Sequence, residues 1–260
     1  MTIEYDAQLA ADTERSYLMP EIVLQRAQTL AALHLQAGEK VLDVGCGMGL
    51  LTQDIALAVG PTGCVVGVDN SSDMLALAKH RCTSLPQVTL KEQSVVQLQE
   101  PDDQYDALTC TQLLLYLPDV PAALQEMWRV LKPGGRIAIV ETDWQGTLFN
   151  SDDQRFVRQL FDQWEASVPS PHLPGQLRGL LLAQGFTAVS VTAIPLINTS
   201  YLPDNYSGSM AHYMTRSQFE AGQITQTQAN NWLTELQERS ENGRYFFCVN
   251  RFLFTAVKGG

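Results

Sequence analysis

Three closely spaced glycines directly after an apolar run form the part of the sequence best suited to binding chemistry. The glycines are Gly45, Gly47 and Gly49, and a helical pattern begins at Leu50. Glycine allows a ligand to approach bare backbone, and the first turn of a helix presents free amide groups to a ligand. Asp43 brings a carboxylate two residues before the first glycine. The segment therefore predicts a ligand-binding loop at the end of a strand.

The spacing of this loop favours one kind of ligand over another. A dinucleotide-binding loop reads GxGxxG, whereas here the spacing is GxGxG and Leu50 stands where the third glycine would be. A carboxylate at Asp43 would repel a pyrophosphate and suits a cationic amino-acid head group. Asp69 follows the next apolar run and could accept hydrogen bonds from ribose hydroxyls.

The elements that must position these residues alternate along the first half of the chain. Helical periods cover residues 20–36, 50–59 and 120–131, and a further helix starts after Ser71 or Ser72; short strand-like runs occupy 41–44, 64–68, 88–91, 105–111 and 136–141. Strands interleaved with helices indicate parallel βαβ units, which place ligands outside the carboxyl ends of the strands. The pattern predicts an α/β fold with a doubly wound sheet.

The second half of the chain departs from this alternation. We expect a helix at residues 152–168, a proline-rich linker at 169–174, a helix that ends at Gly185, a strand at 188–194 and a last strand at 244–257. Residues 201–242 look largely helical, with Asp204 and Thr225 as helix starts. We interpret residues 1–260 as one domain, in which 1–36 form an N-terminal helical cap, 37–145 a cofactor-binding core and 201–242 a helical lid inserted before the last strand.

Four motifs in the first half occur in a characteristic order. They read Asp43-Val44-Gly45-Cys46-Gly47-Met48-Gly49, then Gly67-Val68-Asp69 with Ser72, Asp73 and Met74, then Tyr105-Asp106-Ala107-Leu108, and finally Arg129-Val130-Leu131-Lys132-Pro133-Gly134-Gly135-Arg136. This set resembles the class I S-adenosylmethionine-dependent methyltransferases, and it extends over residues 20–143. The resemblance implies a Rossmann-like methyltransferase fold with a seven-stranded, mostly parallel sheet and a helical insertion before the last strand.

The resemblance also implies a cofactor, S-adenosyl-L-methionine, and the residues that hold it. It assigns Ser94 and Val95 to the adenine, with Gln93 as a neighbouring candidate, and it assigns Gln112 to the methionine portion and Tyr17 to a cover over the cofactor. The full cofactor-binding set is Tyr17, Asp43, Gly45, Gly47, Gly49, Asp69, Asn70, Met74, Ser94, Val95 and Gln112. Asp43 has an alternative role, which is to order the glycine loop without touching the cofactor.

Candidate acceptor residues follow strand ends or lie in the lid. Tyr116, Trp144 and Tyr213 could line a pocket for the acceptor, although aromatic side chains are more often part of the core. Glu141 and Asp143 could bind or polarise a cationic acceptor, or could cap helices. His212 in the lid is the candidate general base, and the four histidines show no metal-ligand spacing, so we predict no metal site.

Composition restricts the partners. The 260 residues include 17 Lys and Arg against 28 Asp and Glu, a formal charge of −11 that disfavours nucleic acid. The sequence after the fourth strand, Thr109-Cys110-Thr111-Gln112-Leu113-Leu114, also lacks the Asn- or Asp-Pro-Pro-aromatic motif of base methyltransferases. Five cysteines without a CxxC pair and the lack of an exported or membrane-inserted segment predict a cytoplasmic protein with no membrane insertion.

These observations favour an S-adenosylmethionine-dependent methyltransferase that acts on a small-molecule acceptor, with a slight preference for a hydrophobic or aromatic one. Methyl transfer is an in-line displacement for which positioning and exclusion of water do most of the work, so it needs a base only where the acceptor must lose a proton. The alternatives are a protein methyltransferase and a cofactor-binding protein without transfer activity. The sequence holds no motif that selects the acceptor, N-, O- or C-methylation, or an oligomeric state.

Overall fold

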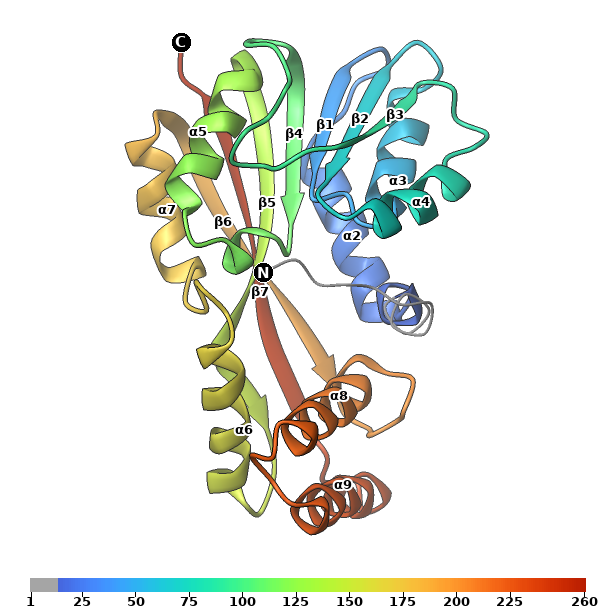
Figure 1. Cartoon of the computed structure of the whole chain (residues 1–260), viewed down its shortest axis with the longest axis vertical. Coiled ribbons are helices and arrows are strands. Elements are labelled where there is room, and N and C mark those ends of the chain that lie inside the picture. The colour runs from blue at the N-terminus through green and yellow to red at the C-terminus, as the bar shows by residue number, and fades with distance from the viewer. Residues whose placement is uncertain (1–13) are drawn as a thin grey trace.

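A computed structural model describes residues 14–260, which contain a seven-stranded sheet with helices on both faces (Figure 1). The strand order is β3-β2-β1-β4-β5-β7-β6; β7 is antiparallel to β5 and β6, and the other pairs are parallel. The strands are β1 (Lys40–Val44), β2 (Cys64–Asp69), β3 (Val88–Glu92), β4 (Tyr105–Thr111), β5 (Leu131–Phe149), β6 (Phe186–Asn198) and β7 (Phe247–Lys258). The predicted doubly wound, mostly parallel sheet is confirmed.

Helices cover the two faces of the sheet and one end of it. Residues of α2 (Pro20–Ala32) and α3 (Leu50–Val59) pack on one face, beside α4 (Ser72–Arg81), while α5 (Val120–Val130) and α7 (Pro174–Ala183) pack on the other. The remaining helices are α6 (Gln154–Ala166), α8 (Tyr206–Glu220), α9 (Gln226–Glu241) and the short 3-10 turn η1 (Leu114–Tyr116). The predicted N-terminal cap at residues 1–36 contains α2, and residues 1–13 of it lie outside the described residues.

Polar side chains at the helix starts explain where the inserted helices begin. Thr225 caps α9 in a reciprocal capping box with Gln228, as a start at Thr225 predicts. The start predicted at Asp204 is wrong by one residue, because Asn205 caps α8 by accepting the Gly208 amide at 2.9 Å. Both helices lie between β6 and β7, so the predicted position of the helical insertion is confirmed.

Two strands, β5 and β6, are much longer than the sequence predicts, whereas β7 agrees with the predicted strand at 244–257. β5, β6 and β7 run past the carboxyl ends of the parallel strands, and α6, α8 and α9 pack around the extension (Figure 1). The boundaries of 136–141 for β5 and 188–194 for β6 were too short. In β5 the apolar run stops at Glu141, and a register shift between Asp143 and Leu148 interrupts the alternation that would reveal the rest of the strand.

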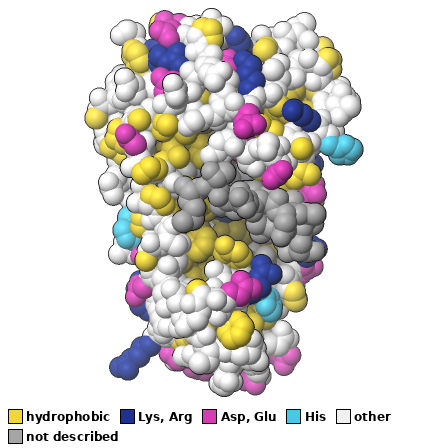
Figure 2. Space-filling model, viewed as in Figure 1, with side chains coloured by type: hydrophobic (Ala, Val, Ile, Leu, Met, Phe, Trp, Pro, Cys, Tyr) yellow, Lys and Arg dark blue, Asp and Glu magenta, His cyan; other side chains and the backbone are white. Residues whose placement is uncertain are grey.

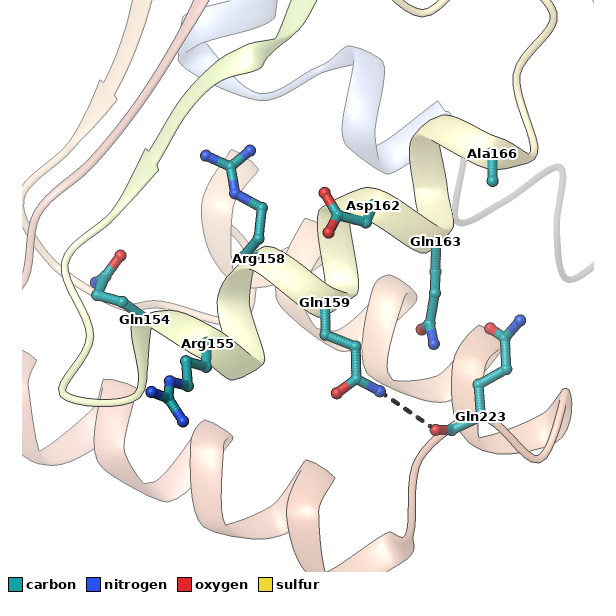
Figure 3. Close-up of a pocket in the computed structure, with 8 residues that line it drawn as sticks. All are labelled: Gln154, Arg155, Arg158, Gln159, Asp162, Gln163, Ala166 and Gln223. Carbon is teal, nitrogen blue, oxygen red and sulfur yellow. Dashed lines mark hydrogen bonds between the residues drawn. The ribbon is translucent and has the colours of Figure 1, made fainter.

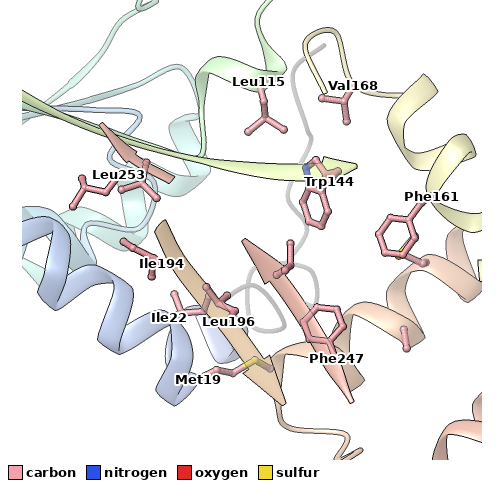
Figure 4. Close-up of a cluster of buried hydrophobic side chains, with 14 of the residues drawn as sticks. Met19, Ile22, Leu115, Trp144, Phe161, Val168, Ile194, Leu196, Phe247 and Leu253 are labelled. Atoms are coloured by element: carbon pink, nitrogen blue, oxygen red, sulfur yellow. The ribbon is translucent and has the colours of Figure 1, made fainter. Parts of the chain in front are cut away.

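The inserted helices share a continuous core with the sheet. Figure 4 shows side chains from α2, the long strands and α6 gathered in this cluster, among them Met19, Trp144, Phe161 and Phe247. Trp232 and Leu236 of α9 belong to the same cluster and are buried. Each such side chain contributes about 1.5–3 kcal/mol of burial free energy, so residues 201–242 are part of the core of the molecule. Among residues 14–260, no helix is long and apolar enough to cross a membrane.

Two glycines provide a stability test of the insertion. A Cβ at Gly208 would lie 1.9 Å from the backbone oxygen of Leu202, whereas a Cβ at Gly179 in α7 would meet no atom within 4 Å. We expect Gly208→Ala to lower the free energy of unfolding by roughly 1–3 kcal/mol because the start of α8 must shift. Gly179→Ala should raise it by about 0.5–1 kcal/mol through helix propensity. Urea denaturation measures both, and equal effects of the two substitutions would contradict the packing of α8 described above.

Candidate functional site

The glycine loop between β1 and α3 has a backbone that exposes one residue to open space. Gly45, Gly47 and Gly49 have φ values of +69°, +51° and +80°, a region that L side chains rarely adopt. A Cβ at Gly45 would lie 2.8 Å from Leu113, and a Cβ at Gly49 would lie 2.9 Å from Ala78. A Cβ at Gly47 would meet no atom within 4 Å. The outer glycines thus permit tight packing, and Gly47 presents bare backbone to a ligand.

Asp69 at the end of β2 holds this loop in place. Its carboxylate accepts the amide of Gly47 at 2.8 Å and the amide of Ser71 at 2.9 Å. The amides of Gly45 and Cys46 both donate to the backbone oxygen of Val68, at 2.8 and 3.0 Å. These bonds join the loop after β1 to the end of β2, so the residue predicted to bind ribose also sets the conformation of the loop.

Asp43 lies beneath the loop as a buried carboxyl group. Its side chain is only 2% exposed and accepts a hydrogen bond from Thr52 Oγ1 of α3 at 2.6 Å. Burial raises the pKa of Asp43 to about 7; the Thr52 hydrogen bond opposes this shift and the nearby Asp69 charge adds to it. Asp43 therefore ties β1 to α3, and it also faces the cavity described next.

A cavity of about 70 Å³ lies beside the glycine loop. Its lining comes from the loop, α2 and the start of α3, β4 and β7: Tyr17, Ile22, Gln25, Arg26, Asp43, Gly45, Cys46, Gly47, Met48, Leu50, Leu51, Thr111 and Arg251. The volume suits a polar head group, since pockets that hold whole drug-sized ligands measure about 300–1,000 Å³. Figure 2 shows hydrophobic side chains near the middle of the face seen in this view.

The other predicted cofactor residues follow the ends of β2, β3 and β4 along the chain, with Met74 in the first turn of α4, and none of them lines the cavity. Met74 is buried against Met48 and Leu50, which forms an apolar patch beside the loop. Asn70 and Ser94 are exposed, and Val95 is buried. These positions are compatible with the predicted roles, and those roles stay predictions.

Polar side chains near the ends of β3 and β4 are held by the protein itself. The amide of Gln93 donates to Glu100 at 2.9 Å and accepts from the Gln99 amide at 2.9 Å, so its polar atoms are already engaged. Gln112 has a φ of +54°, and its side chain accepts from Thr142 at 2.5 Å. A non-glycine residue in this region of φ is uncommon and points to a constrained turn at the end of β4.

The predicted acceptor residues do not meet in the cavity. Glu141 accepts the amides of Leu113 and Leu114, at 3.2 and 2.7 Å, and thereby holds the turn after β4. Burial raises the pKa of Glu141 to about 8, although the backbone amides oppose this shift. Asp143 pairs with Asn250 in the extension of the sheet, and Tyr116 ends η1 at the surface.

Two predicted aromatic residues belong to a row that crosses the extension of the sheet. Trp144 of β5 meets Trp164 of α6 edge-on at 5.5 Å, and Trp164 meets Tyr213 of α8 at 5.9 Å. His212 lies against Tyr201, whose hydroxyl is 3.0 Å from the imidazole Nε2, and burial lowers the pKa of His212. None of these residues lines the cavity beside the glycine loop, so the base role of His212 and the acceptor role of Tyr213 stay predictions.

A second, larger cavity of about 570 Å³ lies on the outer side of α6 (Figure 3). Its lining is Gln154, Arg155, Arg158, Gln159, Asp162, Gln163, Ala166 and Gln223, and Gln159 donates to the backbone oxygen of Gln223 at 3.4 Å. This groove contains long polar side chains of one helix face and none of the predicted site residues. The smaller cavity is therefore the candidate site.

The structure adds residues to the site that the sequence did not single out. Gln25 and Arg26 of α2, Thr111 of β4 and Arg251 of β7 line the cavity. Arg251 shares a strand face with Val249 and Leu253, which are buried and apolar. A cation within an otherwise apolar alternating face is the signal that could have revealed it.

Comparison with known proteins identifies related sequences. Residues 41–135 match the family described as the methyltransferase domain. An uncharacterized 37.1 kDa protein in transposon Tn4556 of Streptomyces fradiae is 29% identical over 260 residues, which cover 98% of this chain and 70% of that protein. The demethylmenaquinone methyltransferase of Oceanobacillus iheyensis is 38% identical over 119 residues, 45% of this chain and 50% of the relative. The chain thus spans about half the length of that relative.

Solved structures share the fold. The Haemonchus contortus phosphoethanolamine N-methyltransferase 2, in complex with S-adenosyl-L-methionine, has a TM-score of 0.65 at 17% identity, covering 98% of this chain and 58% of that one. The [4+2]-cyclase SpnF has a TM-score of 0.60 at 21% identity, covering 91% of this chain and 80% of that one. At these identities the likeness is one of fold.

The buried carboxyl group of Asp43 generates a prediction about pH. Because its folded-state pKa of about 7 lies above the ordinary value, ionisation of Asp43 penalises the folded state as pH rises from about 4 to about 7. The unfolding free energy of Asp43→Asn minus that of wild type should therefore rise by roughly 2–4 kcal/mol as the pH is raised from about 4 to about 7.

Urea denaturation at several pH values measures this difference. Asp162→Asn, at an exposed position on α6, is the control and should track wild type at each pH. A difference between Asp43→Asn and wild type that does not grow with pH would show that Asp43 is already ionised at low pH.

Proposed function

Because residues 41–135 of this chain form a methyltransferase domain of class I, we propose that the protein binds S-adenosyl-L-methionine and transfers its methyl group to a small-molecule acceptor. The observation that carries the proposal is the glycine loop, in which Gly47 faces open space, its amide is held by the Asp69 carboxylate, and Asp43 lines the same cavity.

The residues present fit this cofactor. A cation with an amino-acid end suits the buried carboxyl group of Asp43, which lines the cavity. Ribose hydroxyls suit the carboxylate of Asp69, whose oxygens lie at the end of β2 where the loop opens. The apolar patch of Met48, Leu50 and Met74 offers a surface for a flat ring.

Each residue has a distinct task in this proposal. Asp43 holds the amino-acid end beside the bare backbone of Gly47, Asp69 and Asn70 hold the ribose, and Ser94 with Val95 borders the adenine. Gln112 and Tyr17 close the methionine side, where Tyr17 already lines the cavity. When bound, the sulfonium supplies an electrophilic methyl group. The chain orients the two reactants and keeps water from them, which provides the proximity effect.

We propose that the acceptor is hydrophobic or aromatic. The row formed by Trp144, Trp164 and Tyr213 places three aromatic rings on the extension beyond the strand ends. The relative in Oceanobacillus iheyensis is named for demethylmenaquinone, an observation that supports this class of acceptor. Residues 201–242 would form the lid over it, since Tyr206 at the start of α8 contacts Arg251 at the cavity.

A second candidate function is cofactor binding without methyl transfer. It is favoured by one observation, that a chain of similar fold is named a [4+2]-cyclase. A third possibility, methylation of a protein, would use the same cofactor site.

Incubation with methyl-labelled S-adenosylmethionine and a cell extract separates the candidate functions. Label in the extractable small-molecule fraction supports the proposal, and label in precipitable protein supports protein methylation. Cofactor binding with no labelled product supports the second candidate.

Substitution of Asp69 tests the cofactor site directly. Asp69→Ala should weaken binding of S-adenosylhomocysteine by about 1–3 kcal/mol, because the ribose would lose a charge-assisted acceptor. Asp69→Asn keeps one acceptor oxygen and should have an intermediate effect, and Asp162→Ala, on the exposed face of α6, should bind like wild type. Isothermal titration calorimetry measures the affinities, and wild-type affinity in Asp69→Ala, or tighter binding of NAD than of S-adenosylhomocysteine, would exclude the assignment.

Hydrogen exchange tests the lid. The first residue of α8, Tyr206, contacts Arg251, which lines the cavity. S-adenosylhomocysteine should therefore slow amide exchange in residues 206–212 more than in α9. Deletion of residues 201–242 is a poor alternative, since it would uncover the core that Trp232 and Leu236 help to form. Equal exchange in α8 with and without the ligand would show that the insertion has a structural role only.

A further inference from the structure

Arg251 differs from the other buried cations of the described residues. Three Lys or Arg residues of this part of the chain are buried: Arg239, Arg251 and Lys258. Arg239 pairs with Asp152 and Glu235, and Lys258 pairs with Asp103 at 2.7 Å. Within residues 14–260, Arg251 forms no ion pair. The Glu141 carboxyl group interacts with Arg251 electrostatically but does not form an ion pair with it, so the cost of the buried charge is only partly offset.

The contacts of Arg251 orient its guanidinium without neutralising it. One terminal nitrogen donates to Gln25 Oε1 of α2, and the other donates to Tyr206 Oη of α8 at 3.3 Å. The guanidinium carbon lies 5.3 Å from the centre of the Tyr206 ring. The Nε–H is buried and has no partner. Arginine stays protonated at any physiological pH, so a full positive charge and a free donor remain in place.

The positively charged side chain of Arg251 lies in the wall of the cavity beside the glycine loop. Arg251 lines it together with Thr111, whose buried Oγ1 also lacks a partner, and with the carboxyl group of Asp43. Glu141, on the neighbouring strand β5, accepts the amides of Leu113 and Leu114 through Oε1, while its buried Oε2 has no hydrogen-bond partner and its carboxyl group interacts electrostatically with Arg251. The cavity thus offers an arginine with an unused donor, a free hydroxyl and a separate acidic group.

We propose that Arg251 and Thr111 form a subsite for a carboxylate of the bound ligand, with Gln25 and Tyr206 as positioning residues that orient the guanidinium. The inference rests on the proposed function, because the cavity is the one assigned to the cofactor. The subsite places a binding residue on β7, more than a hundred residues beyond the matched domain at 41–135. The carboxylate belongs either to the amino-acid end of the cofactor or to an acidic acceptor.

The first arm of the test compares two nucleosides that differ in the amino-acid end. S-adenosylhomocysteine carries the carboxylate, and 5′-methylthioadenosine lacks the amino-acid end. Arg251→Gln should lose about ten-fold or more in affinity for S-adenosylhomocysteine and little for 5′-methylthioadenosine, if the cofactor supplies the carboxylate. Arg251→Lys keeps the charge but not the planar fork, so its loss should be smaller. Arg155→Gln, at an exposed site on α6, is the control and should bind both nucleosides like wild type.

The second arm detects an acidic acceptor. Acetate is added to the wild type and to Arg251→Gln, each with and without S-adenosylhomocysteine, and the thermal shift is recorded. If the acceptor supplies the carboxylate, acetate raises the melting temperature of wild type but not of Arg251→Gln, while both bind S-adenosylhomocysteine equally. Near-UV circular dichroism of both Arg251 variants checks that they remain folded.

The outcomes separate the subsite from the proposed function. If wild type binds S-adenosylhomocysteine and Arg251→Gln matches it in both arms, the subsite is wrong and the cofactor site stands. If wild type fails to bind S-adenosylhomocysteine, the proposed function is wrong, and the acetate arm without nucleoside still decides the subsite. In that case an equal change in melting temperature with acetate in wild type and in Arg251→Gln would overturn the carboxylate subsite.

Discussion

The hydrogen bond from the Gly47 amide to the Asp69 carboxylate sets the geometry on which the site depends. It spans 2.8 Å and joins the loop after β1 to the end of β2, two strands held in parallel register by their backbone pairing. With the loop fixed, α3 begins at Leu50, and Thr52 reaches back to Asp43 at 2.6 Å. The side of Gly47 that would carry a Cβ is left open, and Gly47 lines the cavity together with the carboxyl group of Asp43.

Buried charge gathers at this edge of the sheet. Asp43, Glu141 and Arg251 are each at most 5% exposed, and Asp43 and Arg251 line the cavity. Water would solvate each of these groups better than the protein does, so they lower the stability of the folded state where their partners are incomplete. Proteins retain such destabilising groups at sites where a bound ligand supplies the missing partners. The cavity lined by Asp43 and Arg251 is a site of this kind.

The parts of the fold that follow from local pattern were predictable. The glycine loop, Asp69, the alternation of strands and helices and the position of the insertion all depend on short stretches of sequence. The extension of β5 and β6 was not, because Asp143 of β5 pairs with Asn250 across more than a hundred residues and the register shift after Asp143 hides the alternation. Arg251 and Gln25 meet only in the folded chain, and the packing of Trp144 on Trp164 depends on how α6 lies against the extension. For the same reason, the sequence could suggest Trp144, Tyr213 and His212 as site residues but could not show that they lie outside the cavity.

A crystal structure of the protein with S-adenosylhomocysteine would show directly whether the glycine loop holds the nucleoside. We expect electron density across the glycine loop, with the ribose hydroxyls within hydrogen-bonding distance of Asp69 and the amino-acid end beside Asp43. Density for the nucleoside at another place, such as the groove on the outer side of α6, would contradict this placement, as would a loop region that stays free of ligand at saturating concentration.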